Sequence, residues 1–354
     1  MREVERVDAG RAPPGEESVK DVRVIDLSRL LPGPFATLCL QGLGAEVVKV
    51  EDPAGGDFLR HVPPQLGEHG AWFAALNRGK RSVALDLRGA DGRDALLALL
   101  AGADVLVESF RPGVLARLGL DPVGLRVRFP RLVIASLTGW GQTGPYAALP
   151  GHDLGFLSLA GMLGHAVPVV PRFQWADLAA GGLAAALRIA GALLDRARTG
   201  EGAWLDIAML DGLVGLQQTQ FAQLAAGAPP DALLTGGAPV YGLYRCADGG
   251  WVSVAALEPQ FARVLEGATD DLSAEGLTRL FASAPRDAWL DRLGGACVVP
   301  VLTLPEVAAH PQIAARGLFA EGLPHPPTGP VTGAVPALGE HTRAELARAG
   351  YVRA

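Results

Sequence analysis

The chain has 354 residues, of which 49% are apolar and only 19% are charged, so its composition is that of an ordinary globular protein. The formal net charge of -6 argues against a nucleic-acid-binding surface, because phosphate backbones require a clustered excess of Lys and Arg. The three cysteines are far apart and form no C-x-x-C pair, which favours a reducing compartment and excludes a zinc ribbon or a disulfide framework.

The sequence shows no secretory signal after Met1 and no uncharged apolar run long enough to cross a bilayer. We therefore expect a cytoplasmic protein that binds no membrane, no nucleic acid and no metal. Any anionic ligand has to be met by a local group of basic residues within this acidic chain.

Strands and helices are expected to alternate after a loose polar tail. The expected strands cover residues 22–26, 45–51, 82–87, 104–109 and 131–136, and the helices between them cover 32–43 and 91–101. Such alternation predicts βαβ units and a mostly parallel sheet with helices on its faces. Ligands of such sheets bind beyond the carboxyl ends of the strands, so we expect the functional site there.

The second half of the chain predicts a long helix and then a smaller lobe. An Ala- and Leu-rich helix is expected over 178–198, with Asp177 at its start, and a strand over 204–209. A connection rich in Gly, Pro and Ala follows, and the region after it contains two β runs, 241–246 and 251–256. The predicted parts are a flexible tail (1–21), a large lobe (22–226), a small α+β lobe (227–320) and a C-terminal return to the large lobe (321–354).

Several motifs carry more than one explanation when each is taken alone. The run 139–144 matches G-x-G-x-x-G, but Pro145 follows it and no helix opens there, so we do not expect a dinucleotide site. His152, Asp177 and Glu258 bear groups suited to acid–base chemistry. Each also has an ordinary structural explanation, as a helix-capping histidine, a helix N-cap and a surface glutamate respectively.

Two groups of basic residues flank the expected strands. Arg78, Lys80 and Arg81 precede one strand, and Arg111 and Arg117 follow another. Each could be part of a solvated surface. At the ends of parallel strands they could instead bind phosphates, through bidentate contacts from Arg and a point charge from Lys.

A series of short stretches, in this order, resembles the family III CoA-transferase superfamily and, within it, the α-methylacyl-CoA racemases. They are residues 24–28 with 32–34 (VIDLS and PGP), 43–51 (LGAEVVKVE), 77–82 (NRGKRS), 108–113 (ESFRPG), 151–153 (GHD), 236–239 (GGAP), 258–261 (EPQF), 300–302 (PVL) and 306–307 (EV). The combination and order of these stretches over residues 22–320 carry the resemblance.

The resemblance implies an interlocked homodimer, with a Rossmann-like large lobe of one chain facing the small lobe of the other. It implies an acyl-CoA thioester as substrate, so coenzyme A is part of the substrate and no cofactor is tightly bound. Three functions stay open: a racemase of 2-methylacyl-CoA thioesters, a CoA-transferase with Asp177 as nucleophile, and a catalytically silent CoA-thioester-binding dimer. Similar racemases carry residues that match His152 and Glu258 in addition to the aspartate, which favours the racemase.

In similar racemases the residues that match His152 and Asp177 are the acid–base groups on the two faces of a planar enolate. Each such group typically contributes about 10²–10⁴-fold to the rate. Glu258, supplied by the partner subunit, would orient the imidazole. Free N–H groups at the start of the Asp177 helix would stabilise the enolate oxygen, and Gly181 and Gly182 would let another surface pack closely.

The resemblance also implies contacts with coenzyme A from two loops and the side chains near them. The implied residues are Arg60, Ala75, Leu76, Asn77, Arg78, Lys80, Arg81, Phe110, Arg117, Gly151, Asp153, Leu154, Gly155 and Phe156. Two positions depart from the pattern. Asp52 stands where similar proteins carry a phosphate-binding Arg, for which Arg60 or Arg111 would substitute, and Gly155 and Phe156 replace an Asn-Tyr pair.

Overall fold

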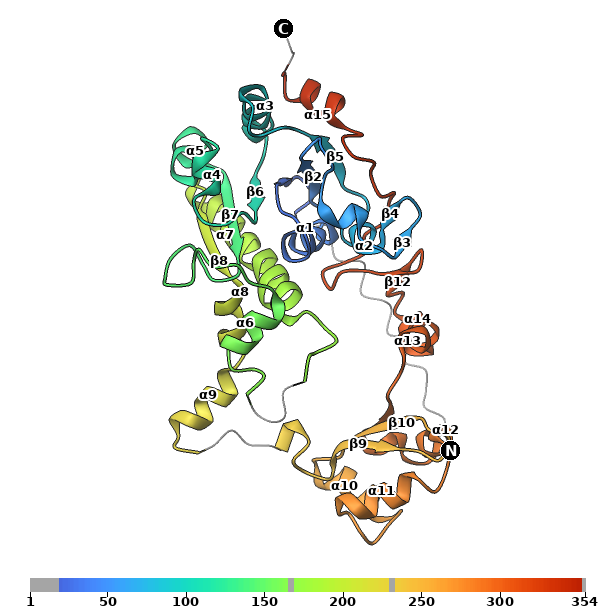
Figure 1. The fold of residues 1–354 in the computed structure, drawn as a ribbon. Coiled ribbons are helices and arrows are strands. Elements are labelled where there is room, and N and C mark those ends of the chain that lie inside the picture. Colours follow the sequence, from blue (N-terminus) through green and yellow to red (C-terminus); the bar gives the residue numbers. More distant parts are fainter. Residues whose placement is uncertain (1–18, 165–168, 229–232, 352–354) are drawn as a thin grey trace. The chain divides into compact units, whose positions relative to one another are not determined.

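The structure, a computed structural model, describes residues 19–164, 169–228 and 233–351. The chain forms two compact units (Figure 1). The first contains the residues up to Leu216 and those from Leu323 onward, and the second is Gln217–Gly322. The boundary that the sequence placed at residue 227 lies inside the second unit, because helix α9 (Gln218–Ala225) groups with it.

Six parallel strands among the described residues form the central sheet of the first unit, in the order β5-β2-β1-β6-β7-β8. They are β1 (Arg23–Asp26), β2 (Glu46–Glu51), β5 (Arg81–Ala84), β6 (Val105–Glu108), β7 (Val133–Thr138) and β8 (Trp204–Ala208). The predicted α/β fold with a mostly parallel sheet is therefore confirmed. The strand order reverses between β1 and β6, and ligands of such sheets bind beyond the strand ends at this point.

Helices cover both faces of this sheet. The remaining elements of the first unit are α1 (Pro32–Gly42), η1 (Phe58–His61), β3 (Gln65–Leu66), β4 (His69–Gly70), α2 (Ala71–Asn77), α3 (Ala90–Ala101), α4 (Val114–Arg117), α5 (Pro122–Arg128), α6 (Asp153–Leu159), η2 (Trp175–Leu183), α7 (Ala184–Thr199), α8 (Met209–Gly215), β13 (Leu323–Pro324) and α15 (Thr342–Arg348). Neighbouring strand residues point to opposite faces, so Val24 packs with residues of α1, α6 and α7, whereas Ile25 packs with residues of α3 and α5.

The long apolar helix begins earlier than the sequence predicted and is not regular throughout. A π-helical segment, η2, runs from Trp175 to Leu183 and continues as α7 to Thr199. Asp177 therefore lies in the first turn, and the N-cap is Gln174. The prediction of Asp177 as the N-cap is wrong, because the helix already begins at Trp175, two residues before Asp177.

This helix is also the one described segment, Trp175–Thr199, that is long and apolar enough to cross a membrane by length and composition. The segment contains Asp177, Arg188 and Asp195, so it does not contradict the prediction that no uncharged apolar run is long enough to cross a bilayer. A single such helix is weak evidence for a membrane protein, since a core helix passes the same test. Here Ala185, Ile189 and Leu193 are buried in the layer that covers one face of the sheet.

The second unit is a small α+β unit of its own. Its antiparallel sheet has the order β11-β10-β9. Its elements are α9, η3 (Leu233–Thr235), β9 (Tyr241–Arg245), β10 (Trp251–Ala255), α10 (Pro259–Glu266), α11 (Ala274–Phe281), α12 (Arg286–Leu293), η4 (Gly294–Ala296), β11 (Val298–Pro300), α13 (Leu304–Ala309), α14 (Pro311–Ala315) and β12 (Phe319–Ala320). The rings of Tyr244, Phe281 and Trp289 contact one another in its core.

Candidate functional site

A cavity of about 340 Å³ lies at the carboxyl ends of β1, β6 and β7, and both His152 and Asp177 contribute to its wall. We call it the main cavity. Its other wall residues are Arg29, Leu30, Pro32, Ser109, Phe110, Arg111, Pro112, Leu137, Thr138, Gly139, Trp140, Ala147, Leu149, Pro150, Gly151, Phe156 and Met209. The two residues that the sequence singled out for proton transfer therefore reach one cavity.

A smaller cavity of about 180 Å³ adjoins the main cavity, since Arg29 and Phe110 belong to both walls. We call it the side cavity. It lies at the ends of β1, β2 and β5. Its remaining wall residues are Leu27, Ser28, Lys49, Val50, Glu51, Asp52, Gly56, Asp57, Leu85, Asp86, Leu87, Arg88 and Leu118. The two cavities together follow the carboxyl ends of neighbouring strands, where the fold predicts a ligand.

His152 is held at the start of α6 but does not use its side chain there. It is the N-cap residue, its backbone is extended (φ −135°, ψ 167°), and its side chain makes no capping hydrogen bond. Among the described residues the imidazole has no hydrogen-bond or ion-pair partner, and the residue is exposed. The explanation of His152 as a helix-capping histidine is therefore wrong, and its ring is available to a bound molecule.

Asp153 connects the helix that carries His152 to the helix that carries Asp177. Its Oδ1 atom accepts a hydrogen bond of 3.0 Å from the backbone N–H of Asp177. The bond fixes the first turn of η2 next to α6. Because it occupies the N–H of Asp177, that group is not one of the free donors that we expected for an enolate oxygen.

Asp177 lies in an environment that favours its protonated form. Burial and, to a smaller extent, the negative charge of Asp153 together raise the pKa of its carboxyl group to about 7. A carboxyl group with this pKa is present in both protonation states near neutral pH, which suits a group that must act as acid and as base. π-Helical turns are rare and often occur at functional sites, and this one contains Asp177.

Close packing around η2 depends on two glycines, as the sequence predicted. A Cβ atom at Gly181 would lie 2.8 Å from Cγ of Met209, and one at Gly182 would lie 2.7 Å from Cδ1 of Phe35. Both contacts are shorter than side chains tolerate, so larger residues would push η2 away from α8 and α1. The two glycines thereby set the position of Asp177 relative to the cavity.

Aromatic side chains form one wall of the main cavity. The ring of Phe156 meets that of Trp140 edge-on, with 4.6 Å between centroids and 77° between planes. A Cβ atom at Gly139 would lie 2.2 Å from the Phe156 ring, and one at Gly151 would lie 2.5 Å from it. Gly139, which opens the G-x-G-x-x-G match, thus makes room for an aromatic ring. No helix directly follows this loop, in agreement with the prediction that the match is not a dinucleotide-binding site.

Comparison with known proteins decides the family. The model of CoA-transferase family III matches residues 19–349. The chain belongs to CoA-transferase family III. It is 36% identical to the α-methylacyl-CoA racemase of Homo sapiens over 95% of this chain and 94% of that protein. It is 34% identical to the acetyl-CoA:oxalate CoA-transferase of Acetobacter aceti over 84% of each. Among solved structures, a CAIB/BAIF family protein from Brucella suis matches with a TM-score of 0.80 and 30% identity, over 94% of this chain and 99% of that one.

In this family III chain, several of the basic residues expected to bind coenzyme A are engaged inside the protein. The Lys80 side chain is fully buried, and its Nζ atom lies 3.3 Å from Oδ2 of Asp26 and donates to Thr37 and Asn77 at 2.8 and 2.9 Å. Burial lowers the pKa of Lys80 to about 8, against the attraction of Asp26. Burial acts to raise the pKa of Asp26, but Lys80 and Lys49 outweigh it and hold that pKa below its usual value.

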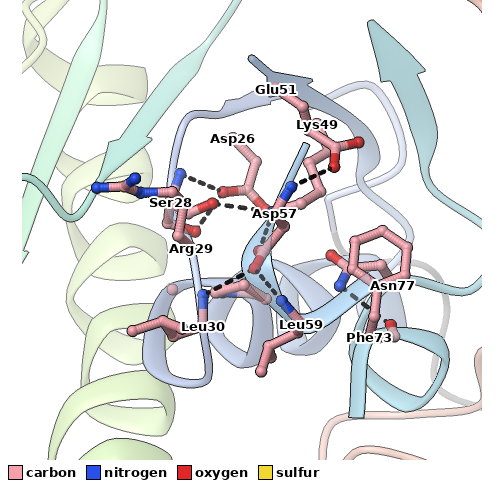
Figure 2. Close-up of polar contacts among 12 residues, drawn as sticks. Asp26, Ser28, Arg29, Leu30, Lys49, Glu51, Asp57, Leu59, Phe73 and Asn77 are labelled. Atoms are coloured by element: carbon pink, nitrogen blue, oxygen red, sulfur yellow. Dashed lines mark hydrogen bonds and ion pairs between the residues drawn. The ribbon is translucent and has the colours of Figure 1, made fainter. Parts of the chain in front are cut away.

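A second set of buried charges lies next to this one. Lys49 forms an ion pair of 3.1 Å with Asp57 and donates to the carbonyl oxygen of Ser28 at 2.8 Å, as Figure 2 shows. Arg60 donates to both carboxylate oxygens of Glu51, at 2.7 and 2.8 Å. These charges compensate one another within the protein, so a phosphate could contact them only after an ion pair had opened.

The other implied coenzyme A residues fall into two groups. Phe110, Gly151 and Phe156 line the main cavity. The residues outside both cavity walls are Ala75, Leu76, Asn77 and Arg78, which belong to or directly follow α2; Arg81, which pairs with Glu345; Arg117 on α4; and Asp153, Leu154 and Gly155 on α6. Direct contact between these residues and coenzyme A stays a prediction.

Glu258 belongs to the second unit. It is the N-cap residue of α10, with no capping hydrogen bond from its side chain, and it is exposed. Its expected contact with the imidazole of His152 stays a prediction.

Two residues near the cavities were not among the site residues that the sequence predicted. Arg29 lines both cavities. Glu108, at the end of β6, accepts a hydrogen bond of 2.8 Å from the N–H of Phe110 and so fixes the turn that forms part of the cavity wall. Burial raises the pKa of Glu108 to about 7, although hydrogen bonds from Ser136 and Phe110 oppose the shift. The sequence signal for both residues is their position at the carboxyl ends of β1 and β6.

Proposed function

We propose that this protein is a racemase of 2-methylacyl-CoA thioesters, acting through an enolate as the similar α-methylacyl-CoA racemases are expected to do. The observation that carries the proposal is the presence of His152 and Asp177 in the wall of one cavity. A thioester acidifies its α-carbon only modestly, so removal of the proton requires a placed base. Inversion requires an acid on the opposite face of the enolate.

His152 and Asp177 would share one transferable proton. When the imidazole is neutral and the carboxyl is protonated, His152 removes the α-proton and Asp177 returns a proton to the other face. In the reverse direction the Asp177 carboxylate is the base and the imidazolium is the acid. The pKa of Asp177 near 7 supports this proposal, because both forms of the carboxyl group are then populated at neutral pH.

The lining of the main cavity supports an apolar acyl group. Trp140, Phe156 and Met209 contribute to the wall that also contains His152. Apolar side chains of this kind suit a branched hydrocarbon chain, which requires no hydrogen-bond partner in the wall.

One observation favours the second candidate, a CoA-transferase in which Asp177 attacks the thioester. Arg111 lines the main cavity, and its guanidinium has no hydrogen-bond or ion-pair partner among the described residues. Its guanidinium could hold the carboxylate of an acid that accepts coenzyme A. The relatives include CoA-transferases, such as that of Acetobacter aceti, as well as racemases.

Incubation of one enantiomer of a 2-methylacyl-CoA in deuterated water distinguishes the two. We expect deuterium at the α-carbon and loss of optical purity at comparable rates. The same sample treated with hydroxylamine should leave Asp177 unmodified. Formation of a hydroxamate on Asp177, with no deuterium at the α-carbon, would contradict the racemase proposal and support the transferase.

We also propose that two copies of the chain associate through α7. Its outward face carries Leu187 and Leu194, with 73% and 71% of their surface exposed, and Leu183 precedes them at helical spacing. Such an apolar stripe is rarely left uncovered. In the homodimer, Glu258 of the partner subunit would approach His152.

Sedimentation velocity tests the association. The wild type should sediment as a dimer, and a variant with both Leu187→Glu and Leu194→Glu should sediment as a monomer. Val127→Glu is the matched control, because Val127 is 82% exposed on another helix. A monomeric wild type, or a double variant that remains dimeric, would contradict this interface.

A further inference from the structure

Arg29 occupies the junction of the two cavities. It follows β1 directly and belongs to both walls. Its guanidinium lies 5.5 Å from the centroid of the Phe110 ring, and its backbone N–H donates to Oγ of Ser109 at 3.1 Å. Figure 2 shows the side chain directed away from the buried ion pairs formed by Lys49 and its neighbours.

The turn that presents Arg29 is held in an unusual conformation. Leu30 has φ of 64°, in the left-handed region that is strained for a residue with a Cβ atom. Its N–H points to Oδ1 of the buried Asp57, at 3.4 Å. Backbone strain of this kind is retained where the surrounding structure fixes it, and it is concentrated at binding sites.

The remaining cations in the wall of the side cavity are already paired. The pairs are Lys49 with Asp57 at 3.1 Å, and Arg88 with Asp52 at 3.1 Å and with Asp86 at 2.9 Å. Arg29 has no carboxylate partner among the described residues. It is therefore the wall cation of the side cavity that can accept an anion without loss of an existing ion pair.

The rest of the side cavity is unfavourable for an anion. Its wall contains more carboxylates than cations: Glu51, Asp52, Asp57 and Asp86 against Arg29, Lys49 and Arg88. The other wall groups are largely apolar, including Leu27, Leu85, Leu87, Phe110 and Leu118. A neutral base with an amino group suits this lining, since leucines cover its ring and a carboxylate accepts from its amine.

We propose that Arg29 binds the diphosphate of the coenzyme A thioester at the junction of the two cavities, and that the side cavity does not recognise the 3′-phosphate. The inference rests on the proposed function insofar as the ligand is a coenzyme A thioester. Arg29 is then a residue that determines specificity for the nucleotide part of the substrate. It takes the role that the sequence analysis gave to Arg60 or Arg111.

The test compares three thioesters of the same 2-methylacyl group, carried by coenzyme A, by dephospho-coenzyme A and by pantetheine, in the α-proton exchange assay. Arg29→Met should raise KM about tenfold or more for the first two, with little change in kcat, because a charge-assisted contact to a diphosphate is lost. KM for the pantetheine thioester should not change. The wild type should accept the dephospho-coenzyme A thioester with KM within about threefold of that for the coenzyme A thioester.

Two variants are matched controls. Arg88→Met removes a paired cation from the side cavity, and Arg111→Met removes an unpaired cation that lines the main cavity alone. Neither should reproduce the selective rise in KM. An equal rise for the pantetheine thioester in Arg29→Met, no rise at all, or a wild-type preference for the 3′-phosphate of tenfold or more would overturn the proposal.

Failure of the proposed function is separable from failure of this inference. If the wild type exchanges no α-proton with any of the three thioesters, the racemase proposal fails. Calorimetric titration with coenzyme A and dephospho-coenzyme A still tests Arg29 in that case, since it requires no turnover. Weaker binding of both by Arg29→Met, with equal affinities in the wild type, would support the inference, and unchanged binding would overturn it.

Discussion

Replacement of His152 by Ala is expected to reduce racemisation of a 2-methylacyl-CoA by about 10²–10⁴-fold, the usual contribution of one placed acid–base group. The side chain of His152 reaches the main cavity and makes no hydrogen bond among the described residues, so the folded structure should be unaffected by its removal. Asp177 remains, and it can still exchange the α-proton of the one enantiomer whose α-proton points toward Asp177. The variant should therefore incorporate deuterium into one enantiomer without inverting it, as chiral chromatography with mass detection would show.

Asp177→Asn is the complementary variant, and it should exchange the opposite enantiomer without inversion. In the wild type the active state carries one proton on the pair, so kcat/KM for racemisation should be bell-shaped in pH, with limbs that belong to the coupled pair. The raised pKa of Asp177 places one limb near 7. A transferase needs only the ionised Asp177, so its rate would rise with pH and level off. A His152→Ala variant with full racemisation would exclude the proposed mechanism.

The central sheet could be predicted because its determinants are local in sequence. Buried parallel strands appear in the sequence as short apolar runs, and the helices between them are about ten to twelve residues long. The carboxyl ends of those strands then indicate where the site lies, and the structure places His152 and Asp177 in a cavity there. The irregular start of the long helix was missed because capping rules assume α-helical spacing, whereas η2 is π-helical.

Whether each basic residue is free to bind a phosphate could not be predicted, because this depends on pairing between positions that are distant in the sequence. Lys80 pairs with Asp26, 54 residues away, and Arg78 donates to the carbonyl oxygen of Pro324, 246 residues away. A motif rich in Lys and Arg near a ligand suggests phosphate contacts, yet here it supplies buried charges that balance carboxylates. Arg29 was missed for the opposite reason, since nothing in its local sequence shows that it has no carboxylate partner.

The buried pairing of Arg60 with Glu51 predicts the largest effect on stability. Arg60→Met should lower the free energy of unfolding by about 3–5 kcal/mol, because it leaves the carboxylate of Glu51 buried without its bidentate partner. Glu51 is 5% exposed, and Arg60 also packs 3.9 Å from the centroid of the Phe73 ring. Chemical denaturation at pH 7 measures the loss. Since Arg60 lines neither cavity, KM for the thioester should stay unchanged in the folded fraction.

The pair Glu51→Gln with Arg60→Met should recover part of the loss, because no uncompensated charge then remains buried. Arg88→Met is the matched control: its ion pairs with Asp52 and Asp86 are exposed, and exposed pairs contribute at most about 1 kcal/mol.

In the wild type, burial acts to raise the pKa of Glu51, but the hydrogen bonds from Arg60 and the charge of Lys49 outweigh it and hold that pKa below its usual value. The stabilisation is therefore present above the pKa of Glu51 in the unfolded chain and is lost as pH falls through the folded value. If Arg60→Met instead left stability unchanged and raised KM selectively for thioesters that carry the nucleotide, Arg60 would be a phosphate-binding residue, and the buried ion pair would not be the reason for its presence.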